Sequence, residues 1–301
     1  MVFAGTAPAA DPALVNLVMP DATVIAGVNV AQAKATPFGQ YVLTLIAPHD
    51  QQLQLLAVAT GFDPRQDVNE LLVATNGPAG SEIGLALARG AFNVSAITTA
   101  ATLVGSKSET YQGVVILESP DGTKGFAFPT STLAVVGDVP SVKSAIDRQS
   151  SGAQHLSSTV VSEINQLSGA NDAWVLTTVP LSSLHTNNVM PSINGLNGQA
   201  LQQVQQANAA VKFGVNVTVT AQAQLDTAQN ATTLAGMLQL LASMAQMQAQ
   251  KAPEAAALAK SVTATAAGST VTVTFSMPQA QIQQLVQTQQ NKVSKIPQKK
   301  Q

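Results

Sequence analysis

The sequence predicts an α+β fold of two similar halves, each an antiparallel sheet with helices packed on one face. The first indication is a strand–turn–strand–helix unit over residues 126–148, whose helix is opened by Asp138 and Pro140. A second unit of the same kind, with a glycine turn, follows over residues 262–286. The order of the remaining elements also corresponds between the halves, which indicates an internal duplication.

The first half is expected over residues 12–150. Apolar residues at helical spacing predict its helices, and apolar, β-branched runs bounded by Gly, Pro or Asn predict its strands. The expected elements are a helix at 11–18, a strand at 23–30, helices at 36–46 and 53–57, strands at 70–75 and 82–89, a helix at 93–104, a strand at 111–118 and the unit at 126–148.

A polar linker at residues 149–154 precedes the second half, which is expected over residues 155–290. Its expected elements are a helix at 159–167, a strand at 173–179, a long loop at 186–198, a Gln-rich helix at 200–210, one long strand or a hairpin at 213–225, a helix at 226–250 and the closing hairpin and helix. Identity between the halves is slight, so the duplication is inferred from order and spacing alone.

Composition limits the partners that the protein can have. Only 10% of the 301 residues are charged, against about 25% in ordinary soluble domains, and the formal net charge is −2. There is therefore no electrostatic basis for binding nucleic acid. The sequence contains no Cys, which excludes disulfides and thiolate chemistry, and no apolar run long enough for a transmembrane helix. We expect no cofactor.

Both ends of the chain differ from the rest. Residues 1–11 are small and uncharged up to Asp11, so they are expected to be either a signal-peptide remnant or a flexible leader. Residues 291–301 are polar and basic and are expected to form a disordered tail. The leader-like segment favours a periplasmic or secreted location.

Few residues are candidates for catalysis. His49 and Asp50 are adjacent in sequence, and His185 lies in a predicted loop. Catalytic use would require a partner that the fold brings close, and solvent-exposed histidines are the alternative interpretation. The common phosphate-binding and nucleophile motifs do not occur in the sequence.

The densest group of possible metal ligands lies in a turn of the first half. Asp63, Asp67 and Glu70 carry carboxylates of the kind that a hard cation such as Ca²⁺ prefers. Their spacing does not match an EF-hand loop, and Asp63 is better interpreted as a turn or helix-cap residue. No metal site is therefore predicted.

The candidate binding residues lie near the boundary between the halves. The loop at 186–198 is long and polar, and Asn187, Asn188, Asn194 and Asn197 offer hydrogen-bond donors and acceptors without charge. If the halves are duplicates, the seam between them would form a concavity bordered by this loop and the polar linker. A neutral ligand or a backbone edge of a partner would suit these amides, and a mobile surface loop without a partner is the favoured interpretation.

Several short segments of the first half form a recognisable set. They are Pro20-Asp21-Ala22, Thr36-Pro37-Phe38-Gly39, residues 61–67 (GFDPRQD), Tyr111-Gln112-Gly113, Gly137-Asp138 and Ala145-Ile146-Asp147-Arg148. Together they resemble an uncharacterised group of exported bacterial proteins of unknown function, mainly over residues 12–150. The resemblance implies an exported protein without an assigned activity, and it transfers no functional residue.

Two classes of function remain open at this point. The favoured one is a non-enzymatic binding or structural module of the bacterial cell envelope, which engages an envelope protein or a neutral or apolar ligand through a sheet face or the seam. The alternative is a hydrolase of unrecognised type that uses a His–carboxylate–Ser cluster.

Overall fold

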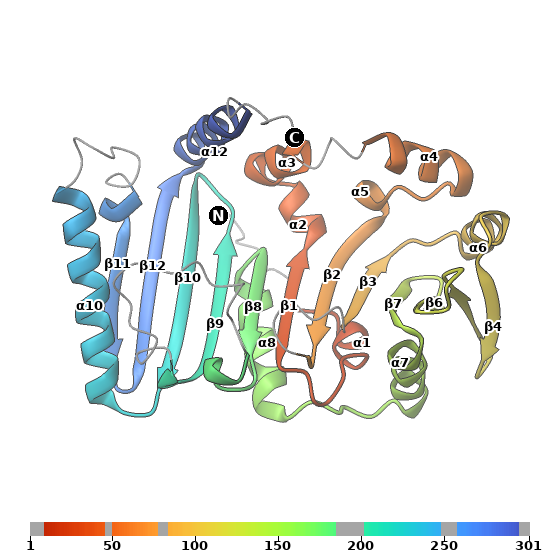
Figure 1. Ribbon diagram of the computed structural model, residues 1–301, viewed down its shortest axis with the longest axis horizontal. Coiled ribbons are helices and arrows are strands. Elements are labelled where there is room, and N and C mark those ends of the chain that lie inside the picture. The colour runs from red at the N-terminus through yellow and green to blue at the C-terminus, as the bar shows by residue number, and fades with distance from the viewer. Residues whose placement is uncertain (1–8, 46–49, 78–83, 185–201, 248–257, 295–301) are drawn as a thin grey trace, which may run out of the picture.

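The computed structural model describes residues 9–45, 50–77, 84–184, 202–247 and 258–294. Within these residues the chain forms one 12-stranded antiparallel sheet with helices on both sides, which is an α+β fold (Figure 1). The strands lie across the sheet in the order β11-β12-β10-β9-β8-β1-β2-β3-β7-β6-β5-β4.

The elements have the following bounds. The strands are β1 (Val24–Asn29), β2 (Val68–Thr75), β3 (Leu85–Gly90), β4 (Lys107–Tyr111), β5 (Val114–Glu118), β6 (Lys124–Thr130), β7 (Leu133–Asp138), β8 (Ala173–Thr177), β9 (Val204–Lys212), β10 (Asn216–Leu225), β11 (Val262–Ala267) and β12 (Thr270–Pro278). The helices are α1 (Pro12–Val15), α2 (Val30–Lys34), α3 (Pro37–Leu45), α4 (Asp50–Thr60), α5 (Pro64–Asp67), α6 (Val94–Leu103), α7 (Val139–Ser151), α8 (Ser158–Ala170), the short 3-10 helix η2 (Leu181–Leu184), α10 (Ala228–Met247) and α12 (Gln279–Ser294).

The two halves of the chain meet in the middle of the sheet, where β1 pairs with β8. Ile25 lies opposite Leu176, and Gly27 lies opposite Trp174. The Trp174 ring crosses Gly27 so closely that a Cβ on this glycine would lie 2.5 Å from it. The strands of the two halves therefore lie side by side in one continuous sheet, because β1 is hydrogen-bonded to β2 on one side and to β8 on the other. No open seam separates the two strands.

The strand orders on the two sides of this seam correspond. Outward from β1, the first half has β1-β2-β3 and then β7-β6-β5-β4, and outward from β8 the second half has β8-β9-β10 and then β12-β11. In each half, three strands in chain order are followed by the remaining strands in reverse order. The internal duplication remains a prediction that this correspondence is compatible with.

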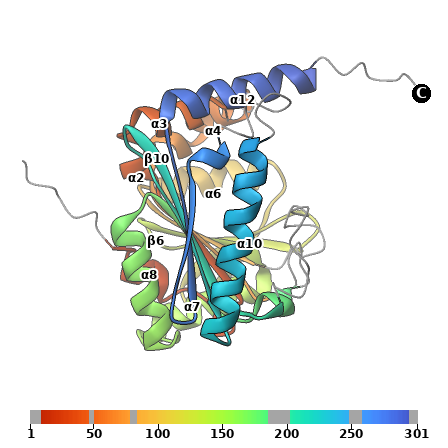
Figure 2. The same cartoon turned by 90° about the vertical axis from the view of Figure 1, so that its left-hand side faces the viewer.

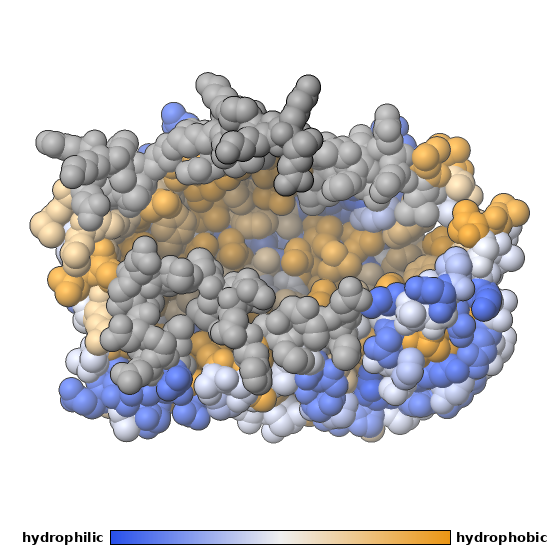
Figure 3. Space-filling model, viewed as in Figure 1, coloured by the Kyte–Doolittle hydropathy of each residue, from blue (hydrophilic) through white to orange (hydrophobic). Residues whose placement is uncertain are grey.

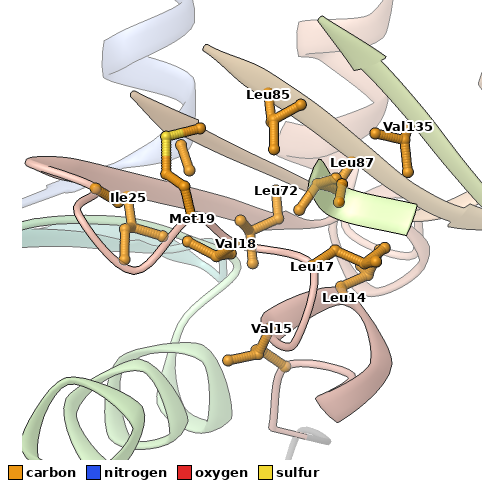
Figure 4. Packing of buried hydrophobic residues seen from close by; sticks show 14 of the residues in the cluster. Leu14, Val15, Leu17, Val18, Met19, Ile25, Leu72, Leu85, Leu87 and Val135 are labelled. Atoms are coloured by element: carbon orange, nitrogen blue, oxygen red, sulfur yellow. The ribbon is translucent and has the colours of Figure 1, made fainter. Parts of the chain in front are cut away.

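One face of the sheet, called here the back face, packs against α1, α7 and α8. Leu14, Leu17 and Val18, in and just after α1, are fully buried there (Figure 4). They meet Ile25 and Leu72, which point to the back from β1 and β2. Full burial of each aliphatic side chain contributes about 1.5–3 kcal/mol, so this N-terminal segment is an integral part of the core.

The opposite face, called here the front face, also carries helices. α10 packs on the front of β11 and β12 through Leu234 and Ala235, which meet Val271. α6 packs near β6 and β7 through Ile97, which meets Phe128. Figure 2 shows α8 and α10 on opposite sides of the strands. The expectation that helices cover one face only is therefore wrong.

Two predicted elements differ from the structure. The Gln-rich segment expected as a helix at 200–210 is largely β9, which is paired with β8 on one side and β10 on the other. Helix propensity is a weak preference, and the pairing of alternate alanines with two neighbours overrides it. The segment before Tyr111 is a further strand, β4, that forms a hairpin with β5.

The predicted opening of α7 is confirmed. Asp138 is the N-cap, and its Oδ1 accepts a hydrogen bond of 2.9 Å from the backbone N–H of Ser141. The helix ends at Gly152, which adopts a left-handed conformation with φ of 64°. The predicted linker at 149–154 therefore lies partly within the last turn of this helix.

Candidate functional site

The front face of the sheet carries long rows of apolar side chains that run across the strands. In an antiparallel sheet, residues directly opposite each other point to the same face, so the strand register defines these rows. One row consists of Ala264, Val273, Ala221, Ala209, Val175, Ala26, Val73, Ala86, Val136, Phe126 and Leu117. The neighbouring row consists of Val262, Phe275, Val219, Val211, Ala173, Val28, Leu71, Ala88 and Ala134.

The middle of these two rows, from β10 to β7, is not covered by a helix of the described chain. We call it the apolar floor. Leu71 is 40% exposed, Val73 is 50% exposed and Val136 is 41% exposed. Figure 3 shows this face as a hollow with hydrophobic residues at its base. The floor is therefore a concave apolar surface that solvent reaches.

Helices close the two ends of the rows. α10 covers the end at β11 and β12, where Val273 and Leu238 both pack against one buried cluster. The helix α6 covers the other end, where Ala134 is buried among aromatic rings that include Phe92 and Phe128. The open stretch between them spans seven strands, which at about 4.8 Å per strand is roughly 30 Å.

The chemistry of the apolar floor is simple. Both rows contain only Ala, Val, Leu and Phe, so they offer no charge and no side-chain hydrogen bond. The strands beneath are each paired on both sides, so their backbone N–H and C=O groups are used within the sheet. The floor can bury apolar surface and can exclude water, but it has no group with which to bind a polar ligand or to catalyse a reaction.

The predicted catalytic and loop residues do not contribute to this surface. His49, His185 and the four asparagines of the predicted binding loop, Asn187, Asn188, Asn194 and Asn197, lie outside the described residues. Asp50 is the first residue of α4. The third histidine, His155, lies near α8, where its Nε2 is 3.1 Å from the Ser151 hydroxyl.

The three predicted metal-ligand candidates serve separate structural roles. Asp63 is the N-cap of α5, and its carboxylate pairs with Arg65 at 2.9 Å. Hydrogen bonds from Arg65 hold the pKa of Asp63 below its ordinary value. Asp67 Oδ2 accepts a hydrogen bond of 2.7 Å from the backbone N–H of Asp63. In the part of the chain that the structure describes, no three His, Cys, Asp or Glu residues are grouped to hold a metal ion.

Glu70, the third candidate, faces the back of the sheet. Its carboxylate accepts hydrogen bonds of 3.1 and 3.3 Å from the backbone N–H of Asp11, and Asp11 in turn pairs with Arg89 at 3.1 Å. Burial raises the pKa of Glu70 above its ordinary value, and the hydrogen bond from Asp11 opposes this shift. The contacts of Asp11 with Glu70 and Arg89 hold the N-terminal segment against the sheet.

Sequence reasoning missed the apolar floor, although its signal is present. The runs NVTVTAQAQL of β10 and TVTVTF of β12 alternate polar and apolar residues strictly, which indicates one apolar and one solvated face. The run ELLVAT of β2 is apolar on both faces. The apolar floor can be recognised only once the pairing of strands that are distant in sequence is known, because this pairing aligns the apolar residues into rows.

The comparisons with known proteins give information about the fold but none about the site. No protein-family model and no curated protein matches the chain. Among solved structures, crystal form III of a protein named TP0453 is similar over 90% of this chain and 96% of its own, with a TM-score of 0.58 and 10% identity. Crystal form I covers 94% and 97% at a TM-score of 0.53 and 10% identity, and form IV covers 90% and 95% at 0.53 and 9%. At such identity the likeness shows a shared fold alone. No helix of the described chain is long and apolar enough to cross a membrane.

Proposed function

We propose that this protein is a non-enzymatic binding module that holds an elongated apolar ligand, an acyl chain, against the apolar floor. The observation behind the proposal is the solvent-accessible row that includes Val73, Ala86 and Val136. Exposed apolar surface costs about 25 cal/mol per Å², so a ligand that covers it gains the corresponding free energy. Large exposed apolar patches on soluble proteins commonly mark ligand or partner sites.

The size and shape of the floor favour an acyl chain. The hydrocarbon core of a bilayer is about 30 Å thick and holds two layers of chains, so one chain extends about 15 Å. The open stretch of about 30 Å accommodates this length. A protein partner would form about one hydrogen bond per 100–200 Å² of interface, and the floor offers no group for such bonds.

Binding of a dansyl-labelled undecanoic acid, followed by its fluorescence, tests the proposal. Val73→Asp and Val136→Asp place a carboxylate in the floor that the ligand would have to desolvate, and we expect each to weaken binding at least tenfold. Both side chains are half exposed, so the fold tolerates the change. Val58→Asp is the matched control, because Val58 is 88% exposed on α4 and lies outside the sheet.

Two outcomes would contradict the proposal. Unchanged probe affinity in both floor variants would show that the chain binds elsewhere. A concentration-dependent dimer of the parent protein that Val73→Asp abolishes, together with no probe binding, would assign the floor to a second copy of the chain instead.

We further propose that the module works in the bacterial cell envelope, outside the cytoplasm. The leader-like residues 1–11, the low content of charge and the resemblance of residues 12–150 to exported proteins support this location. Fractionation of cells that express the full gene is expected to recover the protein outside the cytoplasm. Recovery in the cytosol alone would refute the location without affecting the proposed ligand.

A further inference from the structure

The back of the second half of the sheet carries a surface with the opposite chemistry. On β9 and β10, Gln206, Asn208, Gln222 and Gln224 alternate with the alanines of the front face. Asn208 lies opposite Gln222, and Gln206 lies opposite Gln224, so the four amides form one patch. α8 lies along one side of this patch.

Two adjoining depressions open between α8 and these strands. Their volumes are about 520 and 290 Å³, and Glu163, Asn208 and Gln222 line both. We call this surface the polar trough. A volume of this order lies within the range of small-molecule sites. The apolar floor lies on the other side of the same strands, so the two surfaces are separate.

Glu163 lines both depressions and is held in place by two hydrogen bonds. Its Oε2 accepts a hydrogen bond of 2.6 Å from Gln206 Nε2, and its Oε1 accepts one of 2.8 Å from Asn208 Nδ2. A carboxylate has about four lone-pair positions, so each oxygen can accept a further hydrogen bond from a ligand. The two amide oxygens remain as additional acceptors because their nitrogens are committed to Glu163.

The rest of the lining mixes donors and acceptors without charge. α8 contributes the hydroxyls of Ser158, Thr159 and Ser162, and it also contributes the aliphatic side chain of Leu167. No Lys, Arg or His of the described chain lines either depression. Glu163 would repel an anionic ligand. A metal ion would find only one carboxylate in the trough, and the described residues contain no group of three His, Cys, Asp or Glu side chains that could hold it.

We propose that the polar trough binds a neutral carbohydrate. Sugar hydroxyls both donate and accept, which matches a carboxylate that only accepts beside amides and hydroxyls that do both. Adjacent hydroxyls of one sugar ring can reach the two oxygens of Glu163, and Leu167 offers apolar contact to the C–H groups of the ring. This site is independent of the ligand proposed for the apolar floor.

Saturation-transfer NMR with maltotriose, cellotriose and chitotriose as probes tests the proposal. At least one trisaccharide is expected to give a saturable signal with the full-length protein. Glu163→Gln keeps the size of the side chain but replaces one acceptor oxygen with a donor group, and it is expected to reduce the affinity at least tenfold. Gln222→Leu is the second variant, because Gln222 lines both depressions and is not one of the two amides that donate to Glu163. It is also expected to reduce the affinity.

The control is Thr265→Leu, on the same face of β11 but outside the trough, where Thr265 lies opposite Thr272. Its affinity for the sugar is expected to equal that of the parent. The absence of a saturable signal from all three sugars would overturn the proposal. A signal that survives both Glu163→Gln and Gln222→Leu would overturn it as well, because binding would then lie elsewhere.

Discussion

The close packing of β1 against β8 requires a residue without a side chain at position 27. The Trp174 ring lies across this glycine, and a Cβ would meet the ring at 2.5 Å. Trp174 is itself buried, so the ring has no free space into which to move. Overpacking of this kind typically costs 1–3 kcal/mol.

We therefore expect Gly27→Ala to lower the free energy of unfolding by about 1–3 kcal/mol, measured by urea denaturation. Gly236 in α10 is the control, since a Cβ at that position would have no heavy atom within 4 Å. Gly236→Ala should raise the stability by about 0.5–1 kcal/mol, because glycine is unfavourable inside a helix. A destabilised Gly236→Ala or an unaffected Gly27→Ala would contradict the packing described here.

Glu70 makes stability depend on pH at the acid side of neutrality. Its pKa in the folded protein is raised above the ordinary value of 4.5 by burial. The folded state therefore holds the proton more tightly than the unfolded state does. The contribution of Glu70 to stability grows as the pH falls from neutral through the raised pKa, and it is fully present below 4.5.

Replacement of Glu70 by Gln should remove this contribution to the pH dependence. Between neutral pH and 4.5, we expect the unfolding free energy of Glu70→Gln to rise less on acidification than that of the parent. Denaturant titrations across this range measure the difference. Asp63 does not interfere, because its lowered pKa places its titration below 3.8. Parallel curves for the two proteins would contradict the role assigned to Glu70.

Among the elements, those fixed by local chemistry could be predicted and those fixed by pairing could not. The N-caps Asp63 and Asp138 and the hairpin of β11 and β12 follow from residues close in sequence. β9 could not be identified in this way, because its Gln and Ala residues favour a helix. Its strand conformation depends on β8 and β10, which pair with it on both sides.

The candidate site depends on pairing even more strongly. Apart from β9, each strand of the apolar floor could be predicted to have an apolar face, yet the sequence does not state which strands are neighbours. Val175 of β8 and Ala26 of β1 are adjacent in one row although they are about 150 residues apart in the chain. The floor and the polar trough therefore emerge only from the complete sheet.

For the molecule as a whole, the structure predicts that the two halves unfold together. β1 and β8 share a continuous hydrogen-bonded ladder, and the N-terminal segment of the first half contacts the second half, where the backbone N–H of Ala10 donates to Ser168 Oγ at 2.8 Å. Trp174, the one Trp in the sequence, lies at this junction. Its fluorescence reports the seam, and far-UV circular dichroism reports the entire sheet.

We expect the two signals to give coincident transitions in urea, as a single cooperative unit would. Variants of each half serve as a control, because a destabilising change in either half should move both signals equally. A Trp174 transition that precedes the loss of circular dichroism would show instead that the halves separate before they unfold.

The pairing of β1 with β8 also sets the order of events while the chain is being made. Ribosomes add about 5–20 residues per second, so β8 emerges roughly 7–30 s after β1. During that interval the edge of β1 that later pairs with β8 has no partner. Ile25 also lacks its neighbours Leu176 and Trp174 in the core on the back face. A nascent first half thus presents an unpaired edge that other chains can join. Ribosome-associated chaperones that shield such an edge would therefore matter most before residue 177 has been added.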